Sequence, residues 1–560
     1  MTEMDRSRNR LGSTPVNRRS VLKAGAATAA GAAIGGSALR AAAQDASPAA
    51  SPAVPAGAIV SDVEGVPVAY TEYPEPFTTV DETPGSGGTV TMLTLSYSPP
   101  PTSKDDNTYW QQLEERLGVT YDADVTPISG YNEKIATVFA GGDLPDLFYL
   151  LPGPARPVIY EAMDQGAFYD MTDLVESGGL DEYPNLAAFP DYLWDAVRIN
   201  GRIWGVPKPV LRNNDPNYYR KDFADTLGVE LTDSESVKAF LTGVSNEDPD
   251  GNGQDDTFGL APYGGDWNSF MINQMFRVPY GWRLNDDGTL TNAIETDEYR
   301  QALQFARELY EAGAYHPDAA NLTVEQSVEL MDSGRTGMGN NGFARVFGAN
   351  GFLHTVNRVV PEAVVEPIVL PGHDGGEGIT YQTPGFFGLT AISARAAQDE
   401  EKLRELLRIM NYLFAPFGSE EFTFLNYGEV GVHSDEQEGG GYQLNEKGMA
   451  DRSALVYPFL TENYFFYPGL EGEAERAQKF NEEMARVAVA NPTAGIYSPS
   501  AAENGATLSQ LITDNYTAIV TGRQELDSWD QVVEDWRSRG GDEQRTEYEE
   551  AIRSAAENAG

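Results

Sequence analysis

The sequence predicts an α/β protein built on a parallel sheet. Short apolar runs at 90–95, 119–125 and 147–151 have the length and character of buried strands. Stretches with helical spacing of apolar residues separate these runs, and a strand–helix–strand–helix–strand order requires parallel strands joined by right-handed crossovers. A further helix with one apolar face is expected much later in the chain, between Thr296 and Gly313.

Each expected element has a local justification. The first strand follows a pair of glycines, and the helix after it keeps helical spacing up to Gly118, which stands where a helix ends. A second strand and a helix at about 131–140 lead through Gly141-Gly142 into the third strand. In the later helix, Thr296-Asp297-Glu298 provides a start signal. Trp110 and Tyr310, both at helical spacing, are expected in the core.

Composition excludes several classes of function. The chain has 560 residues, no cysteine, and 85 acidic against 39 basic side chains, for a formal net charge of −46. The acid excess argues against nucleic acid and anionic membrane surfaces as partners, because both attract cationic proteins. Without cysteine, there are no disulfides, thiolate metal sites, thiol nucleophiles or cysteine-linked lipid anchors.

The first 43 residues are interpreted as an export signal rather than as part of the fold. Asn17-Arg18-Arg19-Ser20-Val21-Leu22-Lys23 resembles a twin-arginine box, a weakly apolar stretch follows, and Ala41-Ala42-Ala43 suits a signal peptidase. The alternative is a basic tail before an alanine-rich helix. Residues 44–86, rich in Ala, Pro and Ser, are expected to form a disordered linker. The folded domain is therefore expected at 87–560.

Four segments of the body carry a resemblance through their order and spacing. They are Tyr131-Asn132-Glu133-Lys134 with Gly141-Gly142-Asp143-Leu144-Pro145-Asp146, then Asn200-Gly201-Arg202-Ile203-Trp204-Gly205-Val206-Pro207 with Tyr219-Arg220-Lys221-Asp222, then Ser333-Gly334-Arg335-Thr336-Gly337-Met338, and Leu425-Asn426-Tyr427-Gly428-Glu429-Val430-Gly431-Val432. Over about residues 88–550 the chain thus resembles the extracellular solute-binding proteins of ABC importers (family 1). It is most similar to their large branch that binds aldouronates and oligosaccharides.

The resemblance implies a periplasmic-binding-protein-like (type II) fold, in which two α/β lobes enclose a ligand cleft. The first lobe is expected at about 88–208 and 372–433, and the second at about 209–371. The C-terminal helices, at about 434–555, are expected to pack across both lobes. The sheet argument agrees independently, because open parallel sheets bind ligands outside the carboxyl ends of their strands.

One loop has the spacing of a calcium site. Oxygen-bearing side chains stand at alternate positions between glycines, which suits a hard cation that needs several converging oxygens and a sharply bent chain. The candidate ligands are Asp248, Asp250, Asn252, Gln254, Asp256 and Thr257. Gly259 stands where an EF-hand-type loop has its bidentate Glu. The family has a similar loop that is closed by an acid where this chain has Thr257. The alternative to a structural calcium site is a solvated acidic turn.

The ligand itself is expected to be a carbohydrate, held by aromatic faces and planar polar groups. Position at the expected sheet edge selects Asn340, Asn341 and Phe343, with Trp267 and Tyr427 next. Trp204 and Tyr218 flank the first expected crossover between lobes, and Phe386 and Phe387 follow the second. For each aromatic residue taken singly, a place in the core or hinge is an equally good interpretation.

The chain is expected to be a binding protein and not an enzyme. It contains no Gly-x-Ser-x-Gly, no phosphate-binding loop and no His-Glu-x-x-His, and its four histidines stand far apart in the sequence. The alternatives are a secreted glycoside hydrolase, which would need a pair of carboxylates, and a carbohydrate-binding surface protein. With 85 acidic residues, paired carboxylates carry no information.

The expected partners follow from the resemblance and the signal. They are a small carbohydrate ligand, the transmembrane permease subunits of an ABC importer and the twin-arginine export machinery, and the chain is expected to act as a monomer. Because it has no cysteine for a lipid anchor, the protein is expected to be periplasmic or extracellular, either free or held by an uncleaved signal.

Overall fold

The structure is a computed structural model that describes residues 57–152, 157–263, 265–348, 351–461 and 463–559. The twin-arginine signal expected at 1–43 and the first part of the expected linker lie outside the described residues. The described residues, from Gly57 on, belong to one compact unit. No helix among the described residues has both the length and the apolar character needed to span a membrane.

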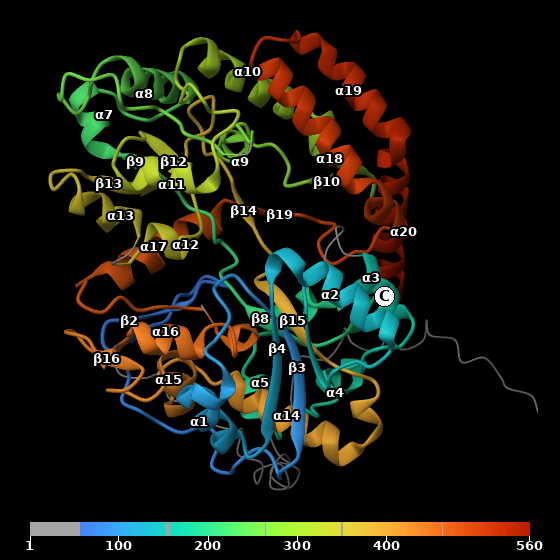
Figure 1. Ribbon diagram of the computed structural model, residues 1–560. Coiled ribbons are helices and arrows are strands. Elements are labelled where there is room, and N and C mark those ends of the chain that lie inside the picture. Colours follow the sequence, from blue (N-terminus) through green and yellow to red (C-terminus); the bar gives the residue numbers. More distant parts are fainter. Residues whose placement is uncertain (1–56, 153–156, 264, 349–350, 462, 560) are drawn as a thin grey trace, which may run out of the picture. The chain divides into compact units, whose positions relative to one another are not determined.

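The first sheet is the parallel sheet that the sequence predicts, with additions from later in the chain (Figure 1). Its strands lie in the order β4 (Thr120–Pro127), β3 (Thr89–Ser96), β5 (Leu147–Leu150), β15 (Phe386–Ile392) and β8 (Val206–Pro209). The strands β3, β4 and β5 are parallel, whereas β15 runs antiparallel to both of its neighbours. The carboxyl ends of β3, β5 and β8 therefore share one edge with the start of β15.

The helices of the first core begin and end where local signals place them. In α1 (Thr108–Leu117), the Asn107 side chain accepts a hydrogen bond from the Trp110 amide, and Gly118 closes the helix at φ 68°. Trp110 lies in the core, as predicted. The other helices of this part are α2 (Ile128–Gly141), α3 (Pro157–Asp164), α4 (Thr172–Glu176), α5 (Pro184–Ala187), α6 (Asp191–Ala196), α14 (Glu400–Leu413) and α15 (Glu420–Tyr427). A hairpin of β6 (Arg198–Ile199) and β7 (Arg202–Ile203) precedes β8.

The second sheet is small and antiparallel, with β9 (Asn217–Arg220) between β12 (Met338–Asn340) and β13 (Val365–Ile368). Around it lie α7 (Lys221–Leu227), α8 (Ser234–Asn246), α9 (Ser269–Met275), α10 (Asp297–Glu311), α11 (Val324–Asp332), α12 (Phe343–Val346), α13 (Phe352–Thr355) and the hairpin β10 (Trp282–Leu284)–β11 (Leu290–Asn292). The predicted helix after Thr296 is α10, capped by the Thr296 hydroxyl. Tyr310, expected in the core, is 40% exposed, because its position on α10 falls at the margin of the buried face.

Residues 57–86, expected to belong to a flexible linker, instead pack on the body. They contain β1 (Ala58–Ile59) and β2 (Val68–Tyr70), and β2 pairs in parallel with β18 (Tyr464–Phe465). Ala69 is fully buried, and the amides of Thr79 and Val80 donate to one carboxylate oxygen of Glu421, each at 2.9 Å. The segment is ordered because its partners lie nearly 400 residues away in sequence, out of reach of any local pattern.

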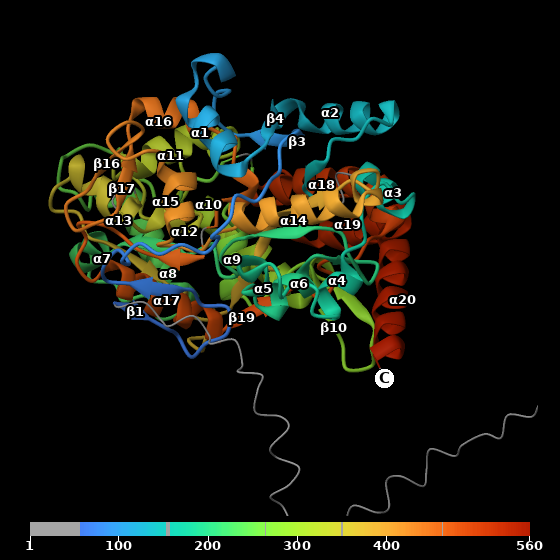
Figure 2. The same ribbon diagram turned by 90° about the horizontal axis from the view of Figure 1, so that it is seen from below.

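The C-terminal segments divide between the two cores. Residues 454–459 join the core of the first sheet, and α18 (Pro499–Val520), α19 (Trp529–Trp536) and α20 (Asp542–Ala559) pack with the core around α10. α18 lies beside both α19 and α20, which follow one another in the chain (Figures 1 and 2). Between these groups stand the hairpin β16 (Ser434–Glu436)–β17 (Tyr442–Leu444), α16 (Glu446–Arg452), α17 (Glu473–Arg486) and β19 (Ala488–Ala490).

Three chain segments run between the two sheets and are bonded to one another. The first segment follows β8 and contains Arg212. The Arg212 carbonyl accepts a hydrogen bond from the Thr383 amide at 2.8 Å, and Arg212 Nη2 donates to Gln382 Oε1 at 2.8 Å. The second contains β14 (Thr380–Gln382), which pairs in parallel with β19 of the third. The Asn481 side chain donates to the Asn213 carbonyl at 2.8 Å. The two sheets are thus connected by three chain segments that hydrogen-bond to one another.

Candidate functional site

The carboxyl edge of the first sheet carries exposed aromatic rings. Tyr97 directly follows β3, and its ring centroid lies 6.3 Å from that of Phe387 in β15 and 5.8 Å from that of Tyr457. Tyr97 is 56% exposed and Phe387 is 43% exposed. Beneath them the Nζ of Lys208, itself buried, lies 5.1 Å from the Tyr457 ring centroid. Large exposed rings at a sheet edge are unusual unless they meet a ligand or partner.

The matching edge of the second sheet carries buried amides with unused hydrogen-bonding capacity. Asn217 begins β9 opposite Asn340, at the carboxyl end of β12. Its Nδ2 donates to Gln274 Oε1 of α9 at 2.7 Å. The Asn217 Oδ1 and the Gln274 Nε2 are buried and have no hydrogen-bond partner among the described residues. Such a pair offers one acceptor and one donor, at a cost in stability that a bound polar ligand would relieve.

Two desolvated carboxylates precede these elements in the chain: Asp215 stands two residues before Asn217, and Asp266 stands three residues before the start of α9. Burial raises the pKa of Asp215, and it raises the pKa of Asp266 to about 6. Both act electrostatically on the ring of Tyr263, which is 41% exposed. The turn that carries Asp266 is strained, since Trp267 has φ 55° and Asn268 has φ 52°. Acceptors of this kind suit a ligand rich in hydroxyl donors.

Several of the residues expected to contact ligand are instead buried in the cores. Trp267 donates from Nε1 to the Thr517 hydroxyl at 3.0 Å, and Trp204 donates to the Ile199 carbonyl at 3.2 Å. Phe343 stacks on Phe347 with ring centroids 4.5 Å apart. Each of these rings, with that of Tyr218, is less than a tenth exposed. In this structure they position neighbouring elements rather than meet solvent.

The other expected contacts remain accessible. Asn340 and Asn341 are partly exposed at the end of β12, and the Asn341 side chain accepts a hydrogen bond from the Gly342 amide at 2.8 Å. Phe386 is half-buried at the first position of β15, and Tyr427 lines a surface hollow. Sequence reasoning missed Tyr97, although it directly follows the first buried strand and so lies at the edge that the sheet rule selects. It also missed Asp215 and Asp266, which no local pattern marks.

The candidate calcium loop holds its acidic side chains close together. Asn252 Nδ2 donates to Asp250 at 2.9 Å and to Asp256 at 3.1 Å, so that this amide nitrogen joins the two carboxylates that a cation would join. Asp248 accepts from the Gly253 amide through Oδ2 at 2.9 Å, while its Oδ1 is buried without a partner. Burial, the nearby Asp248 and the charge of Asp256 raise the pKa of Asp250.

The donor set fits a hard cation only after a small rearrangement. No three acidic or imidazole side chains in the described part of the chain now converge closely enough to hold a metal. The backbone amide of Gln254 donates to Asn252 Oδ1 at 2.7 Å. The Asn252 side chain must therefore turn before this oxygen can bind a cation. Thr257 is buried, and its hydroxyl donates to the Val244 carbonyl at 2.7 Å, which leaves only its carbonyl oxygen for a ligand role.

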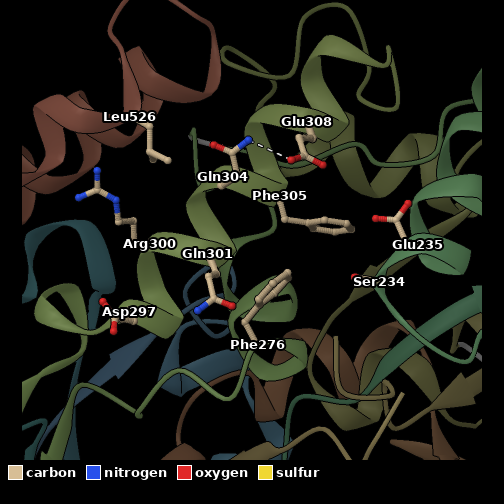
Figure 3. A pocket seen from close by; sticks show the side chains of 10 residues that line it. All are labelled: Ser234, Glu235, Phe276, Asp297, Arg300, Gln301, Gln304, Phe305, Glu308 and Leu526. Atoms are coloured by element: carbon tan, nitrogen blue, oxygen red, sulfur yellow. Dashed lines mark hydrogen bonds between the residues drawn. The ribbon is translucent and has the colours of Figure 1, made fainter. Parts of the chain in front are cut away.

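A separate hollow of about 460 Å³ lies on α10, away from both strand edges (Figure 3). Its walls include Phe276 and Phe305, and the Arg300 guanidinium at its side is already paired with Asp527 and Asp530. The described lining residues come from α8, α10 and the segments beside α9 and α19, with none from either strand edge. We assign it no role.

Comparison with known proteins identifies the family. The sequence pattern of bacterial extracellular solute-binding proteins matches residues 101–408, which is more than half of the chain. The chain belongs to the bacterial extracellular solute-binding protein family. This solute-binding protein is also exported by the twin-arginine route, because the pattern of twin-arginine translocation signals matches residues 15–35. It is a binding protein and not an enzyme.

Relatives of this solute-binding protein agree on the fold. The polygalacturonan/rhamnogalacturonan-binding protein YtcQ of Bacillus subtilis is 24% identical over 462 residues, covering 80% of this chain and 88% of YtcQ. The HMO binding ABC-transporter associated solute-binding protein of Bifidobacterium longum infantis matches with a TM-score of 0.62, 17% identity and coverage of 83% and 99%. The alginate-binding protein AlgQ2, in a crystal structure without calcium ion, matches with a TM-score of 0.58, 13% identity and coverage of 85% and 99%. The predicted two-lobed α/β fold is confirmed.

Proposed function

We propose that this protein captures an oligosaccharide outside the cytoplasm and delivers it to an ABC importer. The observation that carries the proposal is the aromatic cluster at the carboxyl edge of the first sheet, in which Tyr97 and Phe387 are exposed and Tyr457 is half-buried. Flat aromatic faces match the C–H faces of sugar rings, and the amides and carboxylates of the second edge match sugar hydroxyls. The polysaccharides named for YtcQ and AlgQ2 support a ligand of this class.

Capture requires no bond chemistry. A ligand held by both lobes binds the closed state better than the open state, and this difference in affinity shifts the equilibrium between them. The bonded segments that carry Arg212, Gln382 and Asn481 would provide the hinge. Asn340, Asn341, Phe386 and Tyr427 remain our candidates for additional contacts.

The proposal is tested by titrating the exported protein with a panel of neutral and acidic oligosaccharides. We expect a saturable change in the fluorescence of its seven tryptophans, with no new reducing ends. Tyr97→Ala and Phe387→Ala should each weaken binding about 5- to 30-fold, the usual cost of truncating an aromatic contact.

Phe77→Ala is the matched control, because Phe77 is another exposed aromatic residue, and among the described residues its ring forms no pair with a ring of the cluster. Equal affinity for Phe387→Ala, Phe77→Ala and the unchanged protein would overturn the assignment of the cluster. Release of shorter sugars, lost on substitution of a single acid, would favour the alternative of a glycoside hydrolase.

We also propose that the loop from Asp248 to Thr257 binds calcium in a structural role. Its support is the set of close carboxylates, the unpartnered Asp248 Oδ1 and the bridging position of Asn252 Nδ2. The ligands would be Asp248, Asp250, Asn252, Gln254 through its carbonyl, Asp256 and the Thr257 carbonyl. A bound cation would pin the loop between α8 and the strand-like segment at Phe258.

Chelation should therefore destabilise the protein. At calcium concentrations about 100-fold above Kd, binding adds about 2.7 kcal/mol to the free energy of unfolding, so a chelator should lower Tm by a few degrees. Asp248→Ala should abolish this sensitivity. Asp255→Ala, in the same loop but outside the ligand set, should keep it. Identical melting curves in calcium and in chelator would contradict the proposed calcium site.

The expected partner is a membrane permease, and we propose that the protein reaches it as a monomer, because one chain supplies both lobes. A single species at the mass of one chain in light scattering, with or without sugar, would agree. Reconstitution with permease subunits and a labelled oligosaccharide tests delivery directly.

A further inference from the structure

A hollow of about 850 Å³ opens beside the aromatic cluster. Its walls come from the loop after β3, the end of α15, β17 and α16. Tyr427 and Tyr442 form an aromatic wall, with ring centroids 5.7 Å apart, and Met449 adds an apolar rim that is 57% exposed. The same loop connects the hollow to the cluster, because Tyr97 belongs to the cluster and Ser98 to Pro100 line the hollow.

Arg452, at the end of α16, brings an unpaired positive charge to this hollow. Its Nε is buried without a hydrogen-bond partner, and within the described part of the chain no carboxylate lies within ion-pair distance of its guanidinium. The groups that act on it electrostatically are the tyrosines Tyr109, Tyr427 and Tyr464. Burial removes water from the charged guanidinium, and no carboxylate of the described residues replaces that water. Its pKa is lowered for this reason.

The neighbouring acidic groups do not supply that compensation. Asp451 directly precedes Arg452 in the chain, but its buried carboxylate accepts from Lys447 Nζ at 2.5 Å and lies 3.7 Å from His433 Nε2. Glu446 lines the hollow from its exposed rim. The chain has 85 acidic residues and a net charge of −46, so an acidic partner for an arginine is easily available. An arginine with a buried Nε and no such partner therefore indicates that its charge meets an external anion.

We propose that this hollow is a subsite for an acidic sugar unit, whose carboxylate pairs with the Arg452 guanidinium and whose ring packs on Tyr427 and Tyr442. The inference rests on the proposed function and specifies its ligand as an acidic oligosaccharide. The planar guanidinium fork matches a carboxylate with two parallel hydrogen bonds. The acidic surface would repel such a ligand at long range, so its recognition depends on a placed cation.

The test compares two probes on the full exported protein by calorimetry. One is a short oligomer of galacturonate, and the other is the same oligomer with its carboxylates reduced to neutral alcohols. We expect the acidic probe to bind at least tenfold more tightly, as charge-assisted hydrogen bonds imply. Arg452→Gln should remove this preference, so that the acidic probe binds no more tightly than the neutral one.

Two further variants distinguish an effect on binding from a loss of folding. Glu446→Gln, on the exposed rim, should raise the affinity for the acidic probe about twofold, because it removes a weak repulsion. Arg452→Lys should retain part of the preference. Circular dichroism confirms folding of each variant.

The outcomes separate this inference from the proposed function. Equal affinity for both probes, or an acidic preference that survives Arg452→Gln, would overturn the subsite while the oligosaccharide-binding function stands. Binding of neither probe, nor of any sugar in the wider panel, would overturn both.

Discussion

Burial decides the charge of Asp266, which lies in the strained turn before α9. Among the described residues, the only hydrogen bond to its carboxylate comes from the backbone amide of Asn268, at 3.1 Å. Its pKa is about 6 in the folded chain, against 3.8 for an ordinary aspartate. The folded state therefore holds this proton more tightly than the unfolded state. The contribution to stability is fully present below about pH 3.8 and is lost as the pH rises through about 6.

Asp266→Asn should accordingly stabilise the protein at high pH. The amide keeps an acceptor for Asn268 and never carries a charge, so we expect a gain of about 1–3 kcal/mol at pH 8 and almost none at pH 4. Urea unfolding at both pH values measures the difference. Asp143→Asn, which alters an exposed pair with Arg395, should stay within about 0.5 kcal/mol at either pH. A gain for Asp266→Asn that is equal at pH 4 and pH 8 would contradict the pKa assignment.

The aromatic residues mark the limit of sequence reasoning at this scale. Trp267 and Phe343 stand in polar, glycine-rich surroundings that resemble a binding loop, but tertiary packing buries both rings. Tyr97 and Phe387 have similar neighbours, yet their rings stay exposed because each follows or begins a strand at the sheet edge. Composition identifies candidate rings, whereas strand order decides which of them lie exposed at the sheet edge.

Elements with local signals could be predicted, and elements defined by distant pairing could not. The strands β3, β4 and β5 and the helices between them carry apolar periodicity, a cap at Asn107 and a stop at Gly118. The strands β15 and β2 pair with partners far away in sequence, so nothing near them reveals direction or register. The candidate metal loop could be proposed from the sequence because all its candidate ligands lie within one short segment.

The pairing of β2 is itself testable. Ala69 is fully buried between β18 and α17, so Ala69→Asp would place an unpaired charge in the core and should cost more than about 3 kcal/mol. Val60→Asp, in the same segment but 58% exposed, should cost less than about 0.5 kcal/mol. Urea unfolding compares the two variants. Equal stabilities would mean that the segment before β3 is detached in solution, as the sequence had suggested.

At the scale of the whole molecule, each core is assembled from distant parts of the chain. The second core contains α10 and is closed by α18, α19 and α20, where Trp529 stacks on Tyr299 at 5.3 Å and donates to the Ile294 carbonyl at 3.0 Å. The first core ends with residues 454–459. Neither lobe is therefore a continuous stretch of sequence, and the last helices are part of the fold of the second.

This division predicts separate unfolding of the two cores. Trp529→Ala should remove about 3–5 kcal/mol from the second core, and Trp194→Ala should remove a similar amount from the first. In calorimetry, each variant should lower a different transition, and calcium should raise the one that Trp529→Ala lowers, because the Asp248 loop follows α8 in that core. An oligosaccharide that spans both lobes should raise both transitions. One transition lowered equally by both variants would instead show that the hydrogen-bonded segments at Arg212 and Asn481 join the cores into one cooperative unit.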